Sequence, residues 1–441
     1  GEMENRDLEI NESNFIAENT SNKDENIPMK RKEGISYWAA FMNFFRTLLG
    51  PGCLALPVAV KNAGWLASFI LIPILGFFNA YCMVMLVNAA QYLSRKKGQG
   101  PLELGEVAVD ACSNSFPFMK KYGNAFRHVV NACVIGLQMG ITSVYYVFVS
   151  VHSKEIIEQY TDIRHSIHVN IVRSLCSDQL PEDIENNCFL IRQPHLSFSN
   201  LPSINTFNGI LTASGSIIYA YEGLAVVLPI ENKIKKPHQM LGFFGVISTG
   251  ISNVTIFYIL CGILGYITYG NDVKGSISLN LPNDPLYSVL KGLLIVVVFL
   301  GFVLQQYVVI ELTFPKVRNF MLKILNKNQE VKVLSLIIEL FYRAFLVFIC
   351  MIVAITVPNL EDIIPLVGIV CAMLIALVFP PIIDTLIFLP KLLRKFKKCS
   401  ENKFYFKIKI LLFLVKNSFL VFIGIFGLIA GLQATLVSLF K

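Results

Sequence analysis

Charged residues are scarce in this chain of 441 residues: only 15% are Asp, Glu, Lys or Arg, while 54% are hydrophobic. A soluble protein of this length needs more polar surface, because charged side chains are almost never buried. The sequence also has no glycine-rich phosphate loop, no pair of metal ligands on one helix face and no nucleophile elbow. These absences argue against a soluble protein and against an enzyme, and no cofactor is expected.

Long apolar runs are abundant instead. A run of about 20 apolar residues is long enough to cross the hydrocarbon core of a bilayer, and the sequence contains nine such runs. They predict an all-α polytopic membrane protein with one transmembrane domain over residues 34–441, embedded in a lipid bilayer. The expected spans are 37–62, 65–93, 126–150, 206–231, 240–269, 288–314, 334–357, 363–389 and 408–438.

Basic residues alternate from one side of these spans to the other. Lys and Arg cluster before the first span and after the second, fourth, sixth and eighth, whereas the alternate loops carry acids such as Asp272 and Glu361. Because cytoplasmic loops are enriched in Lys and Arg, the pattern predicts a cytoplasmic N-terminus. The Lys and Arg of the cytoplasmic loops account for the net charge of +8, so this charge does not indicate binding to nucleic acid.

Two polar segments lie outside the spans. Residues 1–33 are rich in Glu, Asn and Asp, a composition typical of disorder, and predict a disordered cytoplasmic tail that could bind a cytosolic signalling partner. No cleavable signal peptide is apparent before the first span. Residues 151–205 predict a long lumenal or extracellular loop. Its histidines suit an acid-responsive loop or an ordinary solvated one, and their spacing predicts no metal site; they are His152, His165, His168 and His195.

The first span is interrupted at its centre by Gly50, Pro51 and Gly52, and Pro57 follows. In a bilayer, a broken helix is tolerated only where it is buried in protein or lines a cavity, and such helices form the binding sites of secondary transporters. The N–H groups after the break suit a carboxylate, and the carbonyls before it suit a cation or a donor. The small residues Gly50, Gly52 and Cys53 leave little room, which favours a small ligand.

A second unusual span covers residues 212–232. Glu222 lies near its centre, where a carboxylate costs about 2.5–3.5 kcal/mol, and Gly223 beside it allows the helix to unwind. Tyr219 and Tyr221 supply hydroxyls and aromatic walls. Glu222 either hydrogen-bonds a neighbouring helix as a structural residue or belongs to a second broken helix, where it could carry a proton. Two broken spans about 170 residues apart indicate inverted repeats.

These motifs resemble the amino acid/auxin permease family and, within it, the proton-assisted amino acid transporters. The resemblance covers about residues 35–440, apart from one gap. It implies a LeuT-like fold of eleven helices and sodium-independent transport of small neutral amino acids such as glycine, alanine or proline. The matching stretches are Gly50-x-Gly52 with 56–64, Tyr221-Glu222-Gly223 with 226–233, and 275–282 with 304–308 and Glu311.

The resemblance also implies roles for single residues. The backbone of the first break would receive the substrate carboxylate, and carbonyls of the second break would meet the amino group. Glu222 becomes the candidate for ion or proton coupling, and Arg46, where the family has Lys, would contribute to a cytoplasmic gate. The implied substrate-binding set is Gly50, Pro51, Gly52, Cys53, Tyr145, Tyr219, Ala220, Tyr221 and Gly301.

The sequence departs from the family pattern at three places. Where the family has its fourth and fifth helices, no run approaches 20 apolar residues, so about nine helices are expected, with an open flank toward lipid. Asn43 stands where the family usually has a His tied to proton coupling, and Asn cannot titrate. Asp284 stands where a Cys is common, which removes the family disulfide; Cys176 and Cys188 of the long loop are candidates to pair instead.

Two classes of function stay open. The leading hypothesis is a secondary transporter that moves a small zwitterionic amino acid by alternating access, with proton coupling, in a plasma, lysosomal or vacuolar membrane. The alternative is a non-transporting protein, either an amino-acid sensor that signals through its tail or a truncated regulatory isoform of a full-length transporter.

Overall fold

The computed structural model describes residues 34–98, 100, 102–176, 201–282, 284–324, 332–357, 359–398 and 403–439, with only the backbone in 162–176, 332–333, 398 and 439. In these ranges the chain is almost entirely helical, and the one strand-like contact is a parallel bridge between Ile35 and Ile234. The predicted all-α class is therefore confirmed.

The first predicted span consists of three short helices, α2 (Tyr37–Leu48), α3 (Pro51–Leu54) and α4 (Leu56–Ala63). The side chain of Ser36 caps α2 by accepting a hydrogen bond from the Ala39 amide at 3.3 Å. Gly50 is extended and caps α3, and Pro51 suits the first helical position because it has no N–H to lose there. The interruption predicted at the centre of this span is confirmed: the helix is broken at Leu49 and Gly50 and again at Ala55.

Eight further helical segments in the described ranges are long and apolar enough to cross a membrane. Together with the broken first span they match the nine predicted spans, and one of them, the fourth span, is itself broken. Their helices are α5 (Trp65–Lys97), α7 (Gly123–Cys176), α8 (Phe207–Ala220) with α9 (Leu224–Lys233), α10 (Val246–Tyr269), α11 (Pro285–Ile324), α12 (Lys332–Thr356), α13 (Leu360–Val367), which two π-helical turns join to α14 (Phe379–Lys398), and α15 (Lys403–Leu439).

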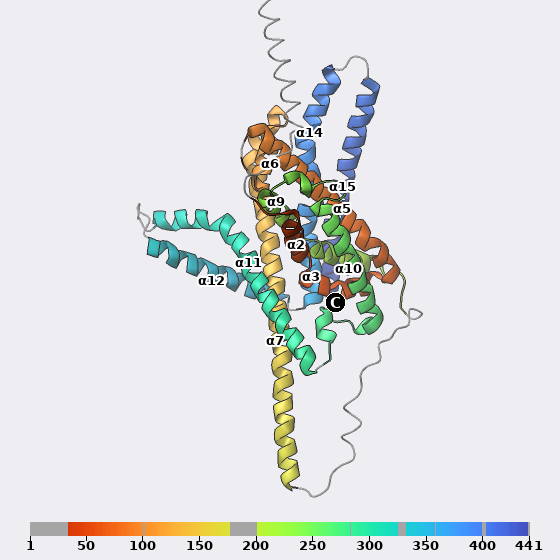
Figure 1. The fold of residues 1–441 in the computed structure, drawn as a ribbon, viewed down its shortest axis with the longest axis vertical. Helices are drawn as coiled ribbons and strands as arrows, with labels where there is room; N and C mark the ends of the chain where they lie inside the picture. The colour runs from red at the N-terminus through yellow and green to blue at the C-terminus, as the bar shows by residue number, and fades with distance from the viewer. Residues whose placement is uncertain are drawn as a thin grey trace, which may run out of the picture.

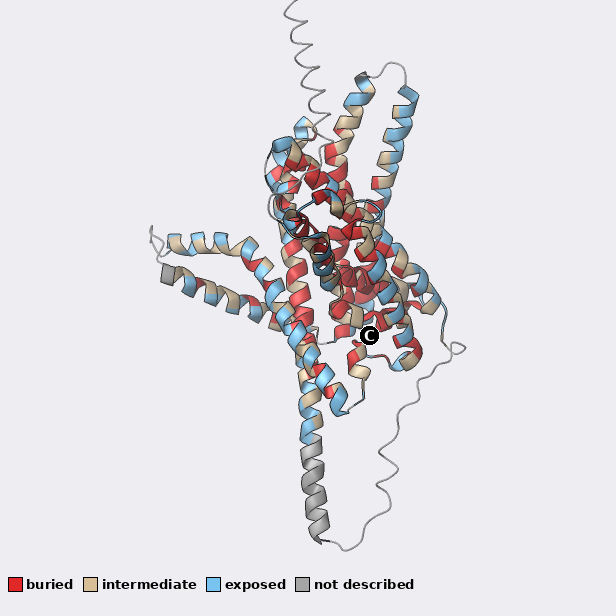
Figure 2. Ribbon diagram, viewed as in Figure 1, coloured by how far each residue is buried: buried red, intermediate tan, exposed pale blue. Residues whose placement is uncertain are grey.

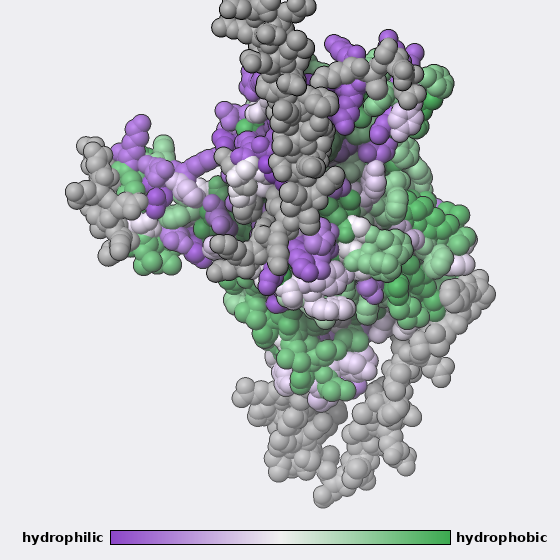
Figure 3. Space-filling view, turned by 45° about the horizontal axis from the view of Figure 1, so that its top comes forward, coloured by the Kyte–Doolittle hydropathy of each residue, from purple (hydrophilic) through white to green (hydrophobic). Residues whose placement is uncertain are grey.

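The broken helices lie at the centre of the molecule. α10 packs against α2, α4 and α5, and α8 packs against α4, α13 and α15, whereas α11 packs mainly on α7 (Figure 1). Figure 2 shows that buried residues concentrate in this centre. On the face shown in Figure 3, hydrophobic side chains cover the middle of the molecule and hydrophilic ones gather toward its upper end, as a membrane-embedded protein requires.

α11 and α12 project from this centre as a hairpin (Figure 1). Most of their residues are exposed or half-buried (Figure 2). Leu293, Phe299 and Phe341, for example, are exposed apolar side chains. This exposed flank agrees with the expectation for a chain without the family's fourth and fifth helices, although the loss of that pair stays a prediction.

The third span is longer than predicted, because α7 continues as helix to Cys176 instead of ending near residue 150. An i,i+4 ion pair between Lys154 and Glu158, at 3.6 Å, supports this extension. His152, assigned by the sequence to the loop, is a buried residue of α7. Cys188 and the tail 1–33 lie outside the described residues, and of Cys176 only the backbone is described, so the tail and the disulfide stay predictions.

Candidate functional site

The two breaks pack directly against each other. α8 ends at Ala220 and α9 begins at Leu224, so the second break lies at Glu222 and Gly223. A Cβ atom added to Gly52 would lie 2.9 Å from the Cα of Ala220 and 3.1 Å from Cδ1 of Tyr219. Only glycine allows this approach. Of the two interpretations of this span that the sequence left open, the structure shows the broken helix, and this break faces the first.

Tyr258 of α10 joins the two breaks. Its hydroxyl lies 2.6 Å from the carbonyl oxygen of Leu48 and 2.5 Å from that of Ala220, and the side chain is fully buried. Both carbonyls belong to the last turn of a helix, where a carbonyl has no intrahelical partner. The single hydroxyl hydrogen is shared between them. Sequence reasoning missed Tyr258, because an isolated tyrosine in an apolar run gives no local signal.

Asn79 of α5 supports the second break from the other side. Its Nδ2 donates a hydrogen bond of 2.7 Å to the carbonyl oxygen of Tyr221, and the Tyr221 hydroxyl lies 2.7 Å from Oγ1 of Thr255. The unwound backbone is thus held by neighbouring helices, as membrane burial requires. A carbonyl oxygen has two lone pairs, so those of Ala220 and Tyr221 can each still accept a bond from a ligand.

A cavity of about 540 Å³ lies beside the first break. Its lining includes Gly50, Pro51 and Cys53 at the break itself, and it is large enough for a small amino acid. A much smaller cavity of about 20 Å³ lies between the two breaks, which is room for about one water molecule. The residues that line this smaller cavity include Gly50, Pro51, Gly52, Tyr145, Tyr219, Ala220, Glu222 and Gln305.

Tyr145 of α7 fits between two glycines. A Cβ atom on Gly301 would lie 2.9 Å from Cε2 of Tyr145, and one on Gly50 would lie 3.4 Å from its hydroxyl oxygen. Gln305 lines the same two cavities as Tyr145. The structure therefore places Tyr145 and Gly301 in one wall of the cavity, opposite the first break.

The cavity reaches the surface at one end of the molecule. Its lining continues along α2 and α9 to the exposed side chains of Asn43, Arg46 and Lys233. At the other end, α4 and α8 are held together, because the Asn205 amide donates to the carbonyl of Ala63 at 2.9 Å and its side chain donates to the carbonyl of Lys61 at 3.2 Å. With the predicted topology, the open end is cytoplasmic.

The α11 side of the cavity is incompletely covered. Val297 and Leu304 line the cavity, yet they are 59% and 61% exposed. Both belong to the exposed flank of α11 described above.

The carboxylate of Glu222 lies at the N-terminus of α9. Its Oε1 accepts a hydrogen bond of 3.3 Å from the Ala225 amide, and the helix dipole favours a negative charge at this position. Its Oε2 is buried and has no hydrogen-bond partner among the described residues. The carboxylate thus lines the small cavity with one oxygen atom available to a proton or to a ligand.

The thiol of Cys53 contacts a second cysteine, Cys261 of α10, whose Sγ donates a hydrogen bond of 3.4 Å to the carbonyl oxygen of Cys53. This contact between Cys53 and Cys261 was not predicted from the sequence. No group of three or more His, Cys, Asp or Glu residues that could hold a metal ion occurs among the residues searched, which are the described ones.

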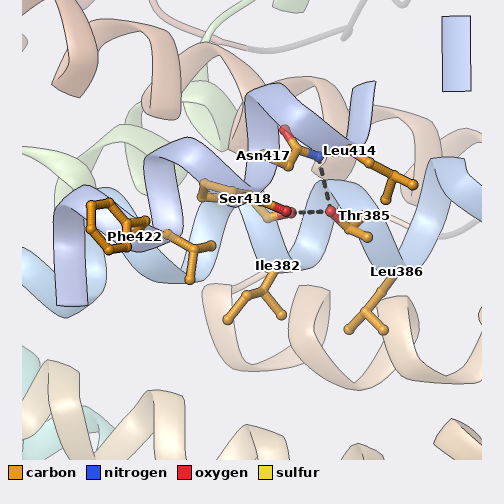
Figure 4. Close-up of a pocket in the computed structure, with 9 residues that line it drawn as sticks. Ile382, Thr385, Leu386, Leu414, Asn417, Ser418 and Phe422 are labelled. Atoms are coloured by element: carbon orange, nitrogen blue, oxygen red, sulfur yellow. Dashed lines mark hydrogen bonds between the residues drawn. The ribbon is translucent and has the colours of Figure 1, made fainter. Parts of the chain in front are cut away.

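A separate pocket of about 350 Å³ lies between α14 and α15 (Figure 4). In it, Nδ2 of Asn417 donates to Oγ1 of Thr385 at 2.9 Å and to Oδ2 of Asp384 at 2.9 Å. Such bonds join neighbouring membrane helices. This pocket shares no lining residue with the cavity at the breaks.

Two helices broken at their centres and packed together beside a cavity are features that secondary transporters share. The pattern of the family described as "Transmembrane amino acid transporter protein" matches residues 33–177 and 187–430, and the chain belongs to this family. It is an integral multi-pass membrane protein that transports amino acids and is not an enzyme. The LeuT-like fold predicted from the sequence is consistent with this family.

Two relatives are similar along most of their length. A "Probable amino acid transporter skat-1" of Caenorhabditis elegans is 28% identical over 387 residues, which cover 82% of this chain and 83% of the relative. A "Proton-coupled amino acid transporter-like protein pathetic" of Drosophila melanogaster is 24% identical over 421 residues, which cover 90% of this chain and 84% of the relative.

Proposed function

We propose that this transporter moves small neutral amino acids, such as glycine, alanine or proline, by alternating access with coupling to protons. The observation that carries the proposal is the close approach of Gly52 to Ala220, where a Cβ atom on residue 52 would lie 2.9 Å from the Cα of Ala220. It brings the backbone of the first break against that of the second. A zwitterion presents a carboxylate and an amino group only two bonds apart, so it requires both kinds of backbone group in one place.

In the proposed complex, the backbone from Gly50 to Cys53 receives the carboxylate, because N–H groups at a new helix start favour a negative charge. The carbonyls of Tyr219, Ala220 and Tyr221 receive the amino group. The 20 Å³ cavity between the breaks must widen to admit both groups, whereas the substrate side chain extends toward the larger cavity.

The substrate side chain is limited by Tyr145. Its ring is held against Gly301, where a Cβ atom would lie at 2.9 Å, so it cannot retreat without moving α11. This restriction supports a preference for small side chains.

Glu222 is the proposed proton carrier. Asn43 cannot titrate, whereas Oε2 of Glu222 is buried without a partner among the described residues and lines the small cavity. A proton on this oxygen would remove a buried charge beside the substrate, which makes the protonation of Glu222 and the binding of a zwitterion depend on each other. Arg46, at the exposed mouth of the cavity, is the proposed contributor to the cytoplasmic gate.

The proposed orientation has the N-terminus in the cytoplasm, so the structure is open to the cytoplasm and closed on the lumenal or extracellular side. The plasma membrane and a lysosomal or vacuolar membrane are both compatible with it. Residues 151–205 are proposed to lie on the lumenal or extracellular side, and a cytosolic partner of residues 1–33 stays a prediction.

The test of substrate class is a competition experiment in proteoliposomes. Uptake of labelled alanine should be inhibited by unlabelled glycine and proline and much less by leucine or phenylalanine. In Gly301→Ala the added methyl group displaces Tyr145, so the preference for glycine and proline over leucine and phenylalanine should change. Gly292→Ala on the same helix is the matched control, because a Cβ atom there meets nothing within 4 Å. Equal inhibition by large and small amino acids would contradict the proposed site, and absence of saturable uptake would favour a sensor or a regulatory isoform.

A further inference from the structure

A buried polar network lies outside the substrate site, at the closed end of the molecule. His152 of α7 is fully buried. Its Nδ1 lies 2.8 Å from the carbonyl oxygen of Phe148, and its Nε2 lies 2.6 Å from Oγ of Ser278. Ser278 in turn lies 2.7 Å from Oγ of Ser276. Both serines belong to the segment between α10 and α11.

The partners of His152 define the positions of its hydrogens. A carbonyl oxygen only accepts, so the contact with Phe148 requires a hydrogen on Nδ1. In the neutral ring Nε2 then accepts, and the hydroxyl of Ser278 donates to it. Oγ of Ser278 is left to accept from the hydroxyl of Ser276. Both imidazole nitrogens and the Ser278 hydroxyl therefore have hydrogen-bond partners when the imidazole is neutral.

The same heavy-atom positions also provide acceptors for both N–H groups of the protonated ring. Nε2 then donates to Ser278, and Ser278 turns its hydrogen toward Oγ of Ser276, which accepts. Because hydroxyl groups both donate and accept, the order of donors reverses without movement of the side chains. A proton on His152 is thus accommodated by reorientation of the two hydroxyl groups.

Two charged side chains act on the imidazole, Glu155 from α7 and Lys291 from α11. Nζ of Lys291 lies 3.1 Å from Oε2 of Glu155 and is almost completely buried; it also donates to the carbonyl oxygen of Leu281 at 3.3 Å. Glu155 and Lys291 neutralise each other. The remaining elements around the serines contribute Lys274 from their own segment and Glu361 from α13, which lies beside Gly275.

The network joins two groups of helices. The segment that carries Ser276 and Ser278 follows α10, which packs on α2, α4 and α5. His152 and Lys291 belong to α7 and α11, which pack on each other. The cavity is closed at this end of the molecule, so these two groups must separate here for the cavity to open on this side.

We propose that His152, Ser276 and Ser278 form a proton-binding site on the lumenal or extracellular side, and that a bound proton favours opening of the transporter toward that side. The physical reason is charge: a protonated imidazole adds a third, unpaired charge to a buried ion pair, and separation of the two helix groups would hydrate it. This inference rests on the proposed alternating access and orientation. The site is distinct from Glu222, which lies at the breaks and contacts the substrate cavity.

The first test is the pH dependence of uptake in oriented proteoliposomes. With the cytoplasmic side held near pH 7.5, acidification of the other side to about pH 5.5 should stimulate uptake of labelled alanine in the wild type. In His152→Gln the stimulation should be several-fold smaller than in the wild type, because only the drive of the gradient through Glu222 remains, and in Ser276→Ala it should require a lower pH. His128→Gln, an exposed histidine at the other end of α7, is the matched control and should keep the wild-type profile. A wild-type profile in His152→Gln would overturn the proposal.

The second test does not depend on uptake. A membrane-impermeant thiol reagent, applied from the lumenal side, should reach Cys53 only when the cavity opens there. At acid pH its rate of reaction should be several-fold higher in the wild type than in His152→Gln, and at neutral pH the two rates should be equal. Comparison at the same pH cancels the pH dependence of the reagent, and Cys53→Ser identifies the labelled residue. If uptake is absent but the labelling rates of the wild type and His152→Gln differ at acid pH, the proposed transport is wrong and the proton-binding site is supported. Equal labelling rates of the two proteins at both pH values would overturn the proton-binding site.

Discussion

Gly52 and Ala220 lie so close that no side chain fits between them: a Cβ atom on residue 52 would lie 2.9 Å from the Cα of residue 220. The two residues are 168 positions apart in the sequence and belong to the first and the second break. Their close approach brings together the free backbone groups of both interruptions, which continuous helices would not offer.

Gly52→Ala should weaken transport strongly. The added methyl group must push the two breaks apart, at a cost of about 1–3 kcal/mol, and 1.4 kcal/mol corresponds to about a tenfold change in binding. Uptake of labelled alanine in proteoliposomes, measured against substrate concentration, should show a KM raised about tenfold or more. Gly292→Ala should be unchanged, because residue 292 has open space around it; normal uptake in Gly52→Ala would contradict the site.

Tyr258→Phe should lower the stability of the protein and slow transport. The substitution removes the hydroxyl shared by the carbonyls of Leu48 and Ala220, and a buried polar group left without its partner costs about 1–3 kcal/mol. The thermal midpoint of the purified protein should fall, together with the uptake rate. Tyr307→Phe, at an exposed tyrosine of α11, is the control and should change neither. An unchanged midpoint in Tyr258→Phe would mean that the breaks do not depend on this bond.

Glu222→Gln should separate substrate binding from proton coupling. Glutamine keeps the shape of the side chain but cannot take up and release a proton, so exchange of labelled for unlabelled alanine should persist while accumulation driven by a pH gradient is lost. Glu311→Gln, at an exposed acid of α11, should behave as the wild type. Gradient-driven accumulation by Glu222→Gln would assign the carrier to another group.

Gly209→Ala should disturb closure at the lumenal end. A Cβ atom on residue 209 would lie 2.1 Å from the carbonyl oxygen of Asn62, so α4 and α8 cannot meet as they do here. Labelling of Cys53 by an impermeant thiol reagent from the lumenal side should be faster than in the wild type. The same rate in both proteins would show that this contact does not hold the lumenal side closed.

The positions of both breaks could be predicted because their causes are local: Gly50, Pro51 and Gly52 interrupt one helix, and Glu222 with Gly223 interrupts the other. The residues that hold the breaks could not be predicted. Tyr258 and Asn79 act through contacts with distant helices, and neither differs in pattern from an ordinary residue of an apolar run. The same limit applies to Tyr145 and Gly301, which the family resemblance supplied and local chemistry did not.

His152 was predicted wrongly: it was assigned to a solvated loop but is a buried residue of a helix. The sequence assigned it to a polar loop because the apolar run ends near residue 150, yet α7 continues and the ring is buried against Ser278. Its burial is possible because Ser276, Ser278 and Lys291 come from other elements. A pattern based on one segment cannot detect partners that the fold brings from elsewhere.

Proton-driven uptake by the purified full chain in liposomes tests the central claim most directly. The measurement compares saturable uptake of labelled glycine, alanine and proline with and without an inward proton gradient. The account predicts accumulation above the external concentration that collapses when a proton ionophore dissipates the gradient. Saturable uptake that ignores the gradient would contradict proton coupling, and well-folded protein without any uptake would contradict the proposal that this chain alone is a working transporter.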